Sequence, residues 1–456
     1  MTDKKKGLKK LKQNGLHRRL SVALTGVTSG ARLLNAHAQT VFKDPQEKEE
    51  RRSLALQQEA LKFAERLGEL KGAYVKIGQM MALYGDHLLP TEITRALRTL
   101  EDQTSAMEWS SIEPVLRHEF GGNYQKLEIN PVPIAAASLS QAHTAVVKET
   151  GEQLCIKVQY PGVSGTIESD FSTVLGMLKL TRWVPNSHEF ELWMQELKQQ
   201  LIDEVDYVRE AQMVAQVQSM TAPSANLIVP NVFPEFSTQR VLALSFIEGY
   251  SITSPQIGML SLARRNALAK TILNHFFDEI FNWGLMQTDP NFGNYKIKLR
   301  AQQQEQDQLG LLDFGAVRPL PETFRQSLCA TILAAHDQNR AQVIENAIAL
   351  GCLHADQAES VKQSFAEFCI LLMEPFRTDH SLTPAYALSK RGDYCWHQSR
   401  LLKRVGKLGA KAILIEGFSS PPKEFALIAR KLTGVFSLVT TLRAEFDAAP
   451  LLDKFR

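Results

Sequence analysis

Hydrophobic residues recur along much of the chain at the three- and four-residue steps of an amphipathic helix. The pattern is clearest over Gln46–Gly85, where it predicts a buried stripe formed by Leu67, Leu70, Tyr74, Ile77, Met81 and Tyr84. Lys76 and Gln79 fall on a different face of this helix, about 60° apart around its axis. Helical geometry alone favours a solvated face for these two residues over a polar site.

The middle of the chain changes to the two-residue alternation of strands. After a helix predicted over Trp109–Phe120, the strands Thr144–Lys148 and Leu154–Gln159 are expected to form a hairpin. Lys157 lies within the second strand, between apolar neighbours. An isolated lysine in such a run usually lies on the surface or at a sheet edge. The alternative is a lysine that binds phosphate and pairs with a glutamate from a helix.

Two helices are predicted next, over Val163–Trp183 and Glu191–Met220. The second helix carries five acidic residues, which are Glu196, Asp203, Glu204, Asp206 and Glu210. If Lys157 binds phosphate, one of these acids must be its partner. Within one continuous helix, Asp203, Asp206 and Glu210 share a face whereas Glu204 lies on another, so Glu204 and Asp206 should meet different partners.

Further strands are predicted at Leu227–Val229, Val232–Phe236 and Arg240–Ile247, with a hinge at Glu248-Gly249. A helix over Leu260–Trp283 should end at Gly284.

The next strands, Tyr295–Leu299 and Gly310–Leu312, flank a polar stretch that we expect to be an exposed loop. A helix over Pro321–Ala335 follows, and the remainder is predicted to be helical.

Two short motifs in this second half carry the candidate chemistry. They are Gln287–Asn294 (QTDPNFGN) and Leu311–Gly315 (LLDFG). Asn294 and Asp313 offer the hard oxygen ligands that Mg²⁺ prefers. Asp289 is a candidate to accept a proton from an attacking hydroxyl or water. Together with Lys157, these residues predict a kinase-like site for Mg²⁺ and ATP or ADP.

A loop ahead of the lysine strand is the candidate cover for the phosphates. Protein kinases use glycines there, but this chain has Ala135, Ala136, Ala137 and Ser138. Because the alanine methyl group disfavours positive φ and close approach, we expect the nucleotide to be held in a different pose. Ser138 and Gln141 are candidates for side-chain hydrogen bonds to the nucleotide. Ile247, which ends the strand before the hinge, is a further candidate contact.

Composition narrows the class of partner. The chain has 456 residues and a net charge of +3, which is too small for a general nucleic-acid binder. The charge is unevenly spread, because residues 4–43 contain no acidic side chain. This basic leader resembles a solvated tail or a contact for anionic lipid, where each lysine near a membrane contributes about 1 kcal/mol. Its composition also resembles a mitochondrial presequence.

The sequence predicts neither a membrane-spanning helix nor a structural metal site. No apolar run reaches the roughly 18 residues of a membrane-spanning helix. Five scattered cysteines indicate a reducing compartment and argue against structural zinc. We expect a leader over residues 1–45, a helical extension over 46–107, a small β-rich lobe over 108–248 and a helical lobe over 249–456.

These motifs resemble those of the AarF/UbiB family of atypical kinases, and within it the coenzyme Q-supporting branch. Seven segments match in order: Lys76-Ile77-Gly78-Gln79 (KxGQ), Ala135–Ser138, Lys157, Glu204 with Asp206 (ExD), Glu210, Asp289 with Asn294, and Asp313. Gln287, Asn291 and Phe292 depart from the HADPHPGN of many members, and Ser140 stands where glycine is usual.

The resemblance implies an α+β, protein-kinase-like, two-lobed fold with an N-terminal helical extension. In the family, the KxGQ face of that extension lies over the pocket and contacts the ExD acids, which excludes protein substrates. The implied activity is lipid-stimulated ATP hydrolysis or phosphorylation of a small molecule in support of ubiquinone biosynthesis. Implied partners are an anionic membrane surface, quinone-biosynthesis proteins or a lipid-like small molecule.

Three alternatives stay open from the sequence. The first is a catalytically silent nucleotide-binding scaffold for a quinone-biosynthesis complex. The second is a protein kinase, which is disfavoured because the chain passes almost at once from Gly315 into a helix and so lacks a platform for docking a peptide. The third concerns location: the resemblance favours the cytoplasm, peripheral to the inner membrane, with the mitochondrial matrix as the alternative.

Overall fold

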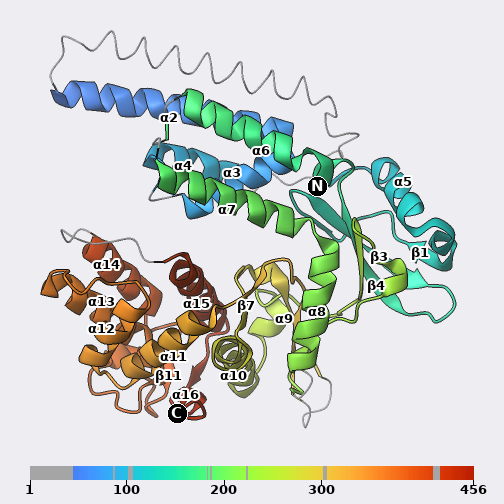
Figure 1. Cartoon of the computed structure of the whole chain (residues 1–456). Helices are drawn as coiled ribbons and strands as arrows, with labels where there is room; N and C mark the ends of the chain where they lie inside the picture. The colour runs from blue at the N-terminus through green and yellow to red at the C-terminus, as the bar shows by residue number, and fades with distance from the viewer. Residues whose placement is uncertain are drawn as a thin grey trace. The chain divides into compact units, whose positions relative to one another are not determined.

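A computed structural model describes residues 45–456 apart from 86–87, 101–105, 182, 185–186, 222–223, 301–305 and 414–421. Residues 1–44 of the predicted leader therefore lie outside the described residues. The chain divides into two compact units (Figure 1). Unit 1 comprises residues up to 212 and 232–246, and unit 2 comprises residues 213–231 and 247–456.

An antiparallel sheet forms one part of unit 1. Its strands are β1 (Leu127–Ile129), β2 (Ala135–Ala136), β3 (Ser140–Val147), β4 (Gln153–Gln159) and β6 (Val241–Ser245), in the order β1-β3-β4-β6 with β2 paired to β3. Lys157 lies opposite Ala142 of β3 and Leu242 of β6. The lysine is therefore on an interior strand, not at an edge.

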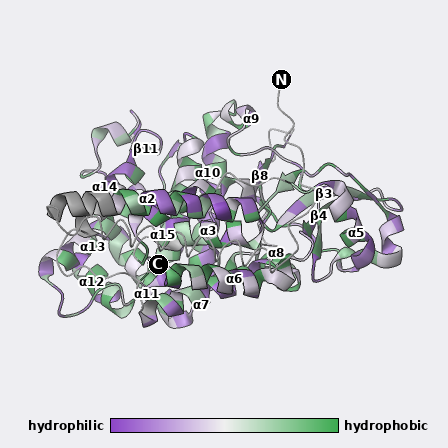
Figure 2. Cartoon of the chain, turned by 90° about the horizontal axis from the view of Figure 1, so that it is seen from above, coloured by the Kyte–Doolittle hydropathy of each residue, from purple (hydrophilic) through white to green (hydrophobic). Residues whose placement is uncertain are grey.

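Helices form the rest of unit 1, and several of them lie side by side (Figure 1). They are α2 (Pro45–Leu70), α3 (Ala73–Tyr84), α4 (Thr91–Leu97), α5 (Trp109–Phe120), α6 (Val163–Leu180), α7 (His188–Glu204) and the first half of α8 (Tyr207–Thr221). The predicted stripe is buried at Leu67, Leu70, Tyr74, Ile77 and Met81, whereas the side chain of Tyr84 lies outside the described residues. Figure 2 shows hydrophilic residues along the visible face of α2.

Two helices predicted as continuous are broken in the structure. The Gln46–Gly85 helix is interrupted between α2 and α3, where Lys71 and Gly72 adopt φ values of 55° and 61°. The left-handed conformation at these residues ends one helix and begins another. The Glu191–Met220 helix is likewise divided into α7 and α8, with Asp206 outside both.

After Ile247, the first helices of unit 2 are α9 (Pro255–Gly258) and α10 (Leu262–Asp278). Helix α10 widens into a π-helical turn over Glu279–Trp283 and ends, as predicted, at Gly284 with φ 60°. A three-stranded sheet follows, in the order β5-β9-β8, formed by β5 (Leu227–Ile228), β9 (Gln308–Leu311) and β8 (Tyr295–Lys298). A second pair joins β7 (Leu285–Gln287) to β10 (Val317–Pro319).

The remainder of unit 2 is mainly helical. Its helices are α11 (Glu322–His336), α12 (Arg340–Ala349), α13 (Glu359–Leu372), α14 (Leu401–Ile413), α15 (Lys423–Thr441) and α16 (Pro450–Asp453). Among the described residues, no helix combines the length and the apolar character needed to cross a bilayer.

Other predicted elements also need correction. Val232–Phe236 is not a strand: Val232 forms an isolated bridge and Pro234–Phe236 a 3₁₀ turn, because Pro234 lacks the N–H that a ladder requires. The polar stretch before β9 is not wholly exposed, because Asp307 is buried and pairs with Arg264. The predicted helical end of the chain contains a two-stranded pair, β11 (Tyr394–Cys395) with β12 (Glu445–Phe446).

Candidate nucleotide and magnesium site

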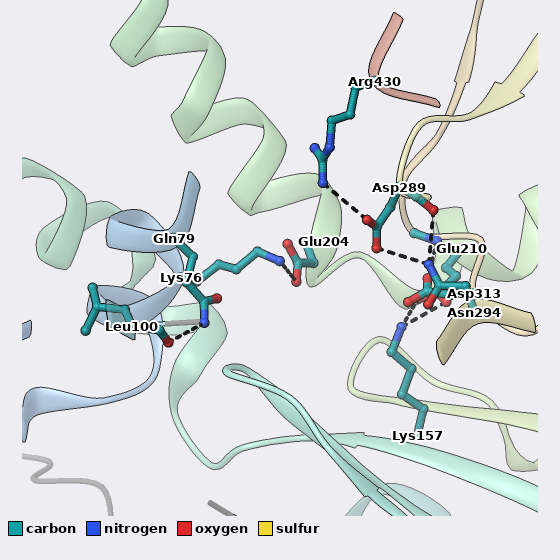
Figure 3. Close-up of polar contacts among 11 residues, drawn as sticks. Lys76, Gln79, Leu100, Lys157, Glu204, Glu210, Asp289, Asn294, Asp313 and Arg430 are labelled. Carbon is teal, nitrogen blue, oxygen red and sulfur yellow. Dashed lines mark hydrogen bonds and ion pairs between the residues drawn. The ribbon is translucent and has the colours of Figure 1, made fainter. Parts of the chain in front are cut away.

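The candidate residues fall into two sets, one in each unit. In unit 1, Lys157 donates from Nζ to both carboxylate oxygens of Glu210, at 2.9 and 2.8 Å (Figure 3). Its Nζ also lies 5.1 Å from the ring centroid of Tyr207, a cation–π geometry. Glu210 is 1% exposed, so its carboxylate is buried in contact with this ammonium. The structure thus identifies Glu210, among the five candidate acids, as the partner of Lys157.

The KxGQ segment lies on α3, also in unit 1. Lys76 pairs through Nζ with Oε1 of Glu204 at 2.6 Å, as the resemblance implied for an ExD acid. Gln79 donates from Nε2 to the Leu100 carbonyl oxygen at 2.9 Å, which ties α3 to the 3₁₀ turn after α4. The glycine between them has a steric reason, because a Cβ at Gly78 would overlap the Leu100 side chain. These two residues pack α3 within the extension, and a catalytic role for Gln79 stays a prediction.

Asp206, the second ExD acid, caps α8. Its Oδ1 accepts from the Arg209 N–H at 3.0 Å, and its carbonyl accepts from the Glu210 N–H at 3.0 Å. Glu204 and Asp206 do meet different partners, but not because they lie on two faces of one helix. The capping of α8 fixes the turn that presents Glu210 to Lys157.

The alanine segment is partly strand. Ala135 and Ala136 form β2, and Ala137 donates its N–H to the Ser140 carbonyl at 2.8 Å. Ser138 is buried. The four residues Ala135–Ser138 have no positive φ, which agrees with the expectation from their methyl groups. Their contact with nucleotide stays a prediction.

Gln141 is used differently from our expectation. Its Oε1 accepts from the Met107 N–H at 2.8 Å, and its Nε2 donates to the Met107 carbonyl at 3.3 Å and contacts His143 Nε2 at 2.9 Å. A hydrogen bond from this amide to nucleotide would require breaking that buried network. The amide of Gln141 therefore holds Met107 to the sheet.

In unit 2, the turn after β7 carries Asp289 and Asn294. Asn294 donates from Nδ2 to the Asp289 carboxylate Oδ2 at 3.0 Å and to the Asp289 carbonyl at 3.2 Å (Figure 3). These bonds fix the orientation of the amide, so its oxygen points away from Asp289. Ile247, the remaining candidate, is buried, and its side chain packs over Gly310 of β9, where a Cβ would come within 2.8 Å.

Asp313 and Asn294 line the same pocket of unit 2. Asp313 accepts through Oδ1 from the Gly315 N–H at 2.9 Å. A carboxylate has about four lone-pair positions, so a bond from one N–H does not preclude a cation. An oriented amide oxygen and a carboxylate form a hard donor set, which fits Mg²⁺.

Gln287 organises this region and was missed as a functional residue in the sequence. Its Nε2 donates to the Asp313 carbonyl at 2.6 Å, and its Oε1 accepts from the Asp289 N–H at 2.9 Å. One side chain therefore bridges the two motifs. Thr288 adds a second bridge, through its N–H and hydroxyl to the Ala316 carbonyl. The only sequence signal was the departure of Gln287 from the family pattern.

Helix α15 supports the same turn from far along the chain. Arg430 forms an ion pair through Nη2 with Asp289 Oδ1 at 3.4 Å (Figure 3). Gly434 lies so close to Pro290 that an added Cβ would overlap the proline ring. No local pattern in the sequence indicated either contact, because the partners are distant in the chain.

Lys431, also on α15, is fully buried. Its Nζ lies 3.4 Å from Glu279 Oε2 and donates to the Tyr295 hydroxyl at 3.0 Å. Glu279 accepts in turn from the Gln287 N–H at 2.8 Å. Burial raises the pKa of the Glu279 carboxyl, and Lys431 and the Gln287 N–H partly offset this. Burial alone would lower the pKa of Lys431, but Glu279 and Tyr295 raise it to about 12.

His275 lies beside this pair, one helical turn before Glu279. Burial, and then the charge of Lys431, lower the pKa of His275 to about 3, so the imidazole is neutral at physiological pH. Its Nε2 lies 3.7 Å from Oε1 of Glu279, and its ring packs against Trp283.

The fold and the two residue sets define a protein-kinase-like protein: a β-rich unit with a lysine–glutamate pair, and a helical unit with the Asp-Asn and Asp-Phe-Gly motifs. Residues 99–347 match the ABC1 atypical kinase-like domain. That match covers more than half of the chain, and the chain belongs to this family, the AarF/UbiB atypical kinases, in the branch that includes COQ8.

Full-length relatives extend the likeness. The chain is 28% identical over 393 residues to the atypical kinase COQ8, mitochondrial, of Saccharomyces cerevisiae, covering 86% of this chain and 74% of the relative. It is 29% identical to the rat atypical kinase COQ8B, mitochondrial (86% and 71%). It is 27% identical to the probable serine/threonine-protein kinase abkA of Dictyostelium discoideum (87% and 70%).

A solved structure shares the fold. The Rv3197–erythromycin complex from Mycobacterium tuberculosis aligns with a TM-score of 0.59 at 22% identity, covering 85% of this chain and 93% of that one.

Proposed function

We propose that the chain is an Mg²⁺-dependent atypical kinase or ATPase that binds ATP or ADP. The observation that carries this proposal is the buried pair of Lys157 and Glu210. A buried carboxylate that pairs with an ammonium holds that ammonium at a defined place on the sheet, which suits it to bind phosphate oxygens. A surface lysine would not need such a partner.

The residues of unit 2 support the same proposal. Asn294 and Asp313 would hold Mg²⁺, which when bound neutralises charge on the nucleotide phosphates. Asp289 would accept the proton of a hydroxyl or a water. Its N–H is fixed by Gln287 and its carboxylate is held by Asn294 and Arg430, so its position is set before any substrate binds.

We further propose that the protein supports ubiquinone biosynthesis at an anionic lipid surface. The likeness to the COQ8 relatives supports this. Because those relatives are named mitochondrial, we favour the mitochondrial matrix side of the inner membrane over the cytoplasm. Quinone-biosynthesis proteins or a lipid-like small molecule are the proposed partners, and the phosphate acceptor is that small molecule or water.

A silent nucleotide-binding scaffold is the second candidate. The ion pair with Arg430 favours it, because a carboxylate oxygen engaged by a guanidinium is less available to an attacking hydroxyl or water. Phosphate release in the presence of phosphatidylglycerol vesicles separates the two functions. Turnover that is lost in Asp289→Asn supports the enzyme, whereas nucleotide binding with no turnover in the unaltered chain supports the scaffold.

The magnesium assignment has its own test. We expect Asp313→Asn to abolish Mg²⁺-dependent binding of ADP in isothermal titration calorimetry, because it removes one anionic ligand. Asp356→Asn, at an exposed site between α12 and α13, is the matched control and should bind as the unaltered chain does. Unchanged binding in Asp313→Asn would contradict the assignment.

A further inference from the structure

Unit 2 contains a second pocket, which lies just before α14 and which the residues proposed for nucleotide do not line. Its volume is about 500 Å³, and its lining residues are Tyr386, His397, Gln398 and Arg400. That volume lies in the range of roughly 300–1,000 Å³ found for small-molecule sites. Among the described residues, no acidic side chain lines this pocket.

The polar groups of the pocket are not used by the protein itself. Among the described residues, no hydrogen bond or ion pair engages the Tyr386 hydroxyl, the Gln398 amide or the Arg400 guanidinium. Nδ1 of His397 is buried and also lacks a partner. A buried polar atom without a partner costs free energy, and a guanidinium alone offers five N–H donors. A ligand that accepts several hydrogen bonds would satisfy these groups.

The turn that carries three of these residues is fixed by hydrogen bonds. Ser399 is fully buried; its hydroxyl accepts from the Leu401 N–H at 3.2 Å and donates to the Trp396 carbonyl at 2.9 Å. The Gln398 N–H donates to the Cys395 carbonyl at 3.1 Å. The backbone of the pocket is therefore ordered before a ligand binds, which lowers the entropic cost of binding.

A neighbouring arginine is already neutralised, whereas Arg400 is not. Arg404, one helical turn further along, donates from Nη1 to Glu374 Oε2 at 2.7 Å and from Nε to the Ser399 carbonyl at 3.1 Å. Glu374 is 1% exposed and also accepts from the Tyr394 hydroxyl at 2.9 Å. This carboxylate serves Arg404, so the charge of Arg400 is left for a ligand.

The charge around the pocket favours an anion. Residues 386–407 contain one acidic residue, Asp393, and six basic ones, which are Lys390, Arg391, Arg400, Lys403, Arg404 and Lys407. Arg400 also directly precedes α14, and the first N–H groups of a helix carry partial positive charge.

The donor set selects phosphate among anions. A guanidinium presents paired N–H groups that match two oxygens of a phosphate or a carboxylate. The oxygens of a carboxylate lie in one plane, whereas those of a phosphate are tetrahedral. A phosphate held by Arg400 can therefore also accept from Tyr386 and Gln398, which lie on other sides of the pocket.

We propose that this pocket binds the phosphate group of a soluble phosphomonoester. The volume exceeds that of one phosphate, so the rest of a small molecule fits beside it. The site is separate from the one proposed for ATP or ADP, and the proposal does not depend on whether the protein hydrolyses ATP.

Binding is tested with glycerol phosphate as the probe, by phosphorus NMR titration of the full chain in the presence of EDTA. The chelator removes Mg²⁺, so the metal cannot hold the probe at Asn294 and Asp313. We expect Arg400→Gly to weaken binding at least about tenfold, because it removes the charged donor. Tyr386→Phe removes one hydroxyl, keeps the ring and should weaken binding severalfold.

The backbone makes Arg400→Gly a mild change. Arg400 has a φ of 51°, a left-handed conformation that glycine adopts more readily than arginine. We therefore expect its urea midpoint to be no lower than that of the unaltered chain. If this variant fails to fold, Tyr386→Phe decides.

Arg443→Gly is the matched control. Arg443 is exposed, has a φ of 48° and does not line the pocket, so the same charge and the same backbone conformation are altered elsewhere. It should bind glycerol phosphate as the unaltered chain does, and so should Asp313→Asn. Arg400→Gly should in turn bind ADP with Mg²⁺ unchanged, which would show that the two sites are separate.

Several results would overturn the proposal. Equal binding of glycerol phosphate by Arg400→Gly and the unaltered chain would remove the site, and so would equal weakening in Arg443→Gly. Acetate binding as tight as that of glycerol phosphate would remove the selectivity for phosphate. Loss of binding in Asp313→Asn alone would place the probe at the nucleotide site. Binding that depends on Arg400 and is seen with vesicles of phosphatidic acid, but not with glycerol phosphate, would assign the pocket to a lipid head group instead.

Discussion

Replacing Lys431 by methionine would isolate the carboxylate of Glu279 inside unit 2. The two side chains are 1% and 3% exposed, and Lys431 Nζ lies 3.4 Å from Glu279 Oε2. A buried ammonium 3.4 Å from a carboxylate oxygen has the geometry of an ion pair, so we treat Glu279 as ionised. Methionine has a similar length and fills the space without a charge.

Two magnitudes bound the expected loss of stability. At 3.4 Å and an effective dielectric constant of about 20, the attraction between the charges is about 5 kcal/mol. The carboxylate can instead take up a proton, which from the ordinary glutamate pKa of 4.5 costs about 3.4 kcal/mol at pH 7. The less costly route sets the limit, so we expect Lys431→Met to lower the free energy of unfolding by about 3 kcal/mol at pH 7.

The direction of the pH dependence follows from the same proton. In the variant the folded-state pKa of Glu279 is raised further above its unfolded value. Stability is then retained below the unfolded pKa and lost as the pH rises towards the folded pKa. The destabilisation should therefore shrink by about 1.4 kcal/mol for each unit of acidification between pH 7 and pH 5.

Urea unfolding followed by far-ultraviolet circular dichroism at pH 5, 6 and 7 measures this. The double variant Lys431→Met with Glu279→Gln should recover most of the loss, because glutamine still accepts from the Gln287 N–H without a charge. A loss below about 1 kcal/mol at pH 7, or a loss independent of pH, would refute the assignment of a buried ion pair.

Three further outcomes are expected. Gly434→Ala should displace Pro290, lower turnover at least about tenfold and lower the free energy of unfolding by about 1–3 kcal/mol. The matched control is Gly406→Ala on α14, which has open space around it and should lower neither turnover nor stability. Below pH 6.5 the unfolded chain binds a proton at His275 that the folded protein excludes, so the free energy of unfolding falls by about 1.4 kcal/mol per pH unit. His275→Phe should remove this part of the pH dependence. Urea midpoints at pH 7 and 5 check this, and an unchanged slope would contradict it. Cys155 should resist iodoacetamide at pH 8, because burial raises the pKa of its thiol to about 11, and rapid labelling in the folded chain would disprove this.

The sequence predicted the elements whose signals are local. The helix Trp109–Phe120, the hairpin that carries Lys157 and the helix ended by Gly284 all appear in the structure. Each has an apolar period and a terminating glycine or turn within a few residues. The same local signals did not show the interruptions at Gly72 and Asp206, since a short break leaves the apolar period on either side intact.

The contacts that hold the candidate site residues in place could not be predicted from the sequence. Gln287 and Arg430 act through contacts whose partners depend on the completed fold. The burial of Lys431 could not be predicted for a related reason. A lysine at the surface and a lysine buried with a glutamate give the same helical pattern in the sequence. Gln141 is a case of the opposite kind: it is predicted from its place beside the candidate loop to contact ligand, and in the structure its amide also holds Met107.

The contact between Gly434 and Pro290 has a consequence during synthesis of the protein on the ribosome. The turn with Asp289 leaves the exit tunnel well before α15 has been translated, and until then it lacks the helix against which it packs. A nascent or prematurely terminated chain would expose that turn to proteases and chaperones. Competence for catalysis would then come only after α15 has been made.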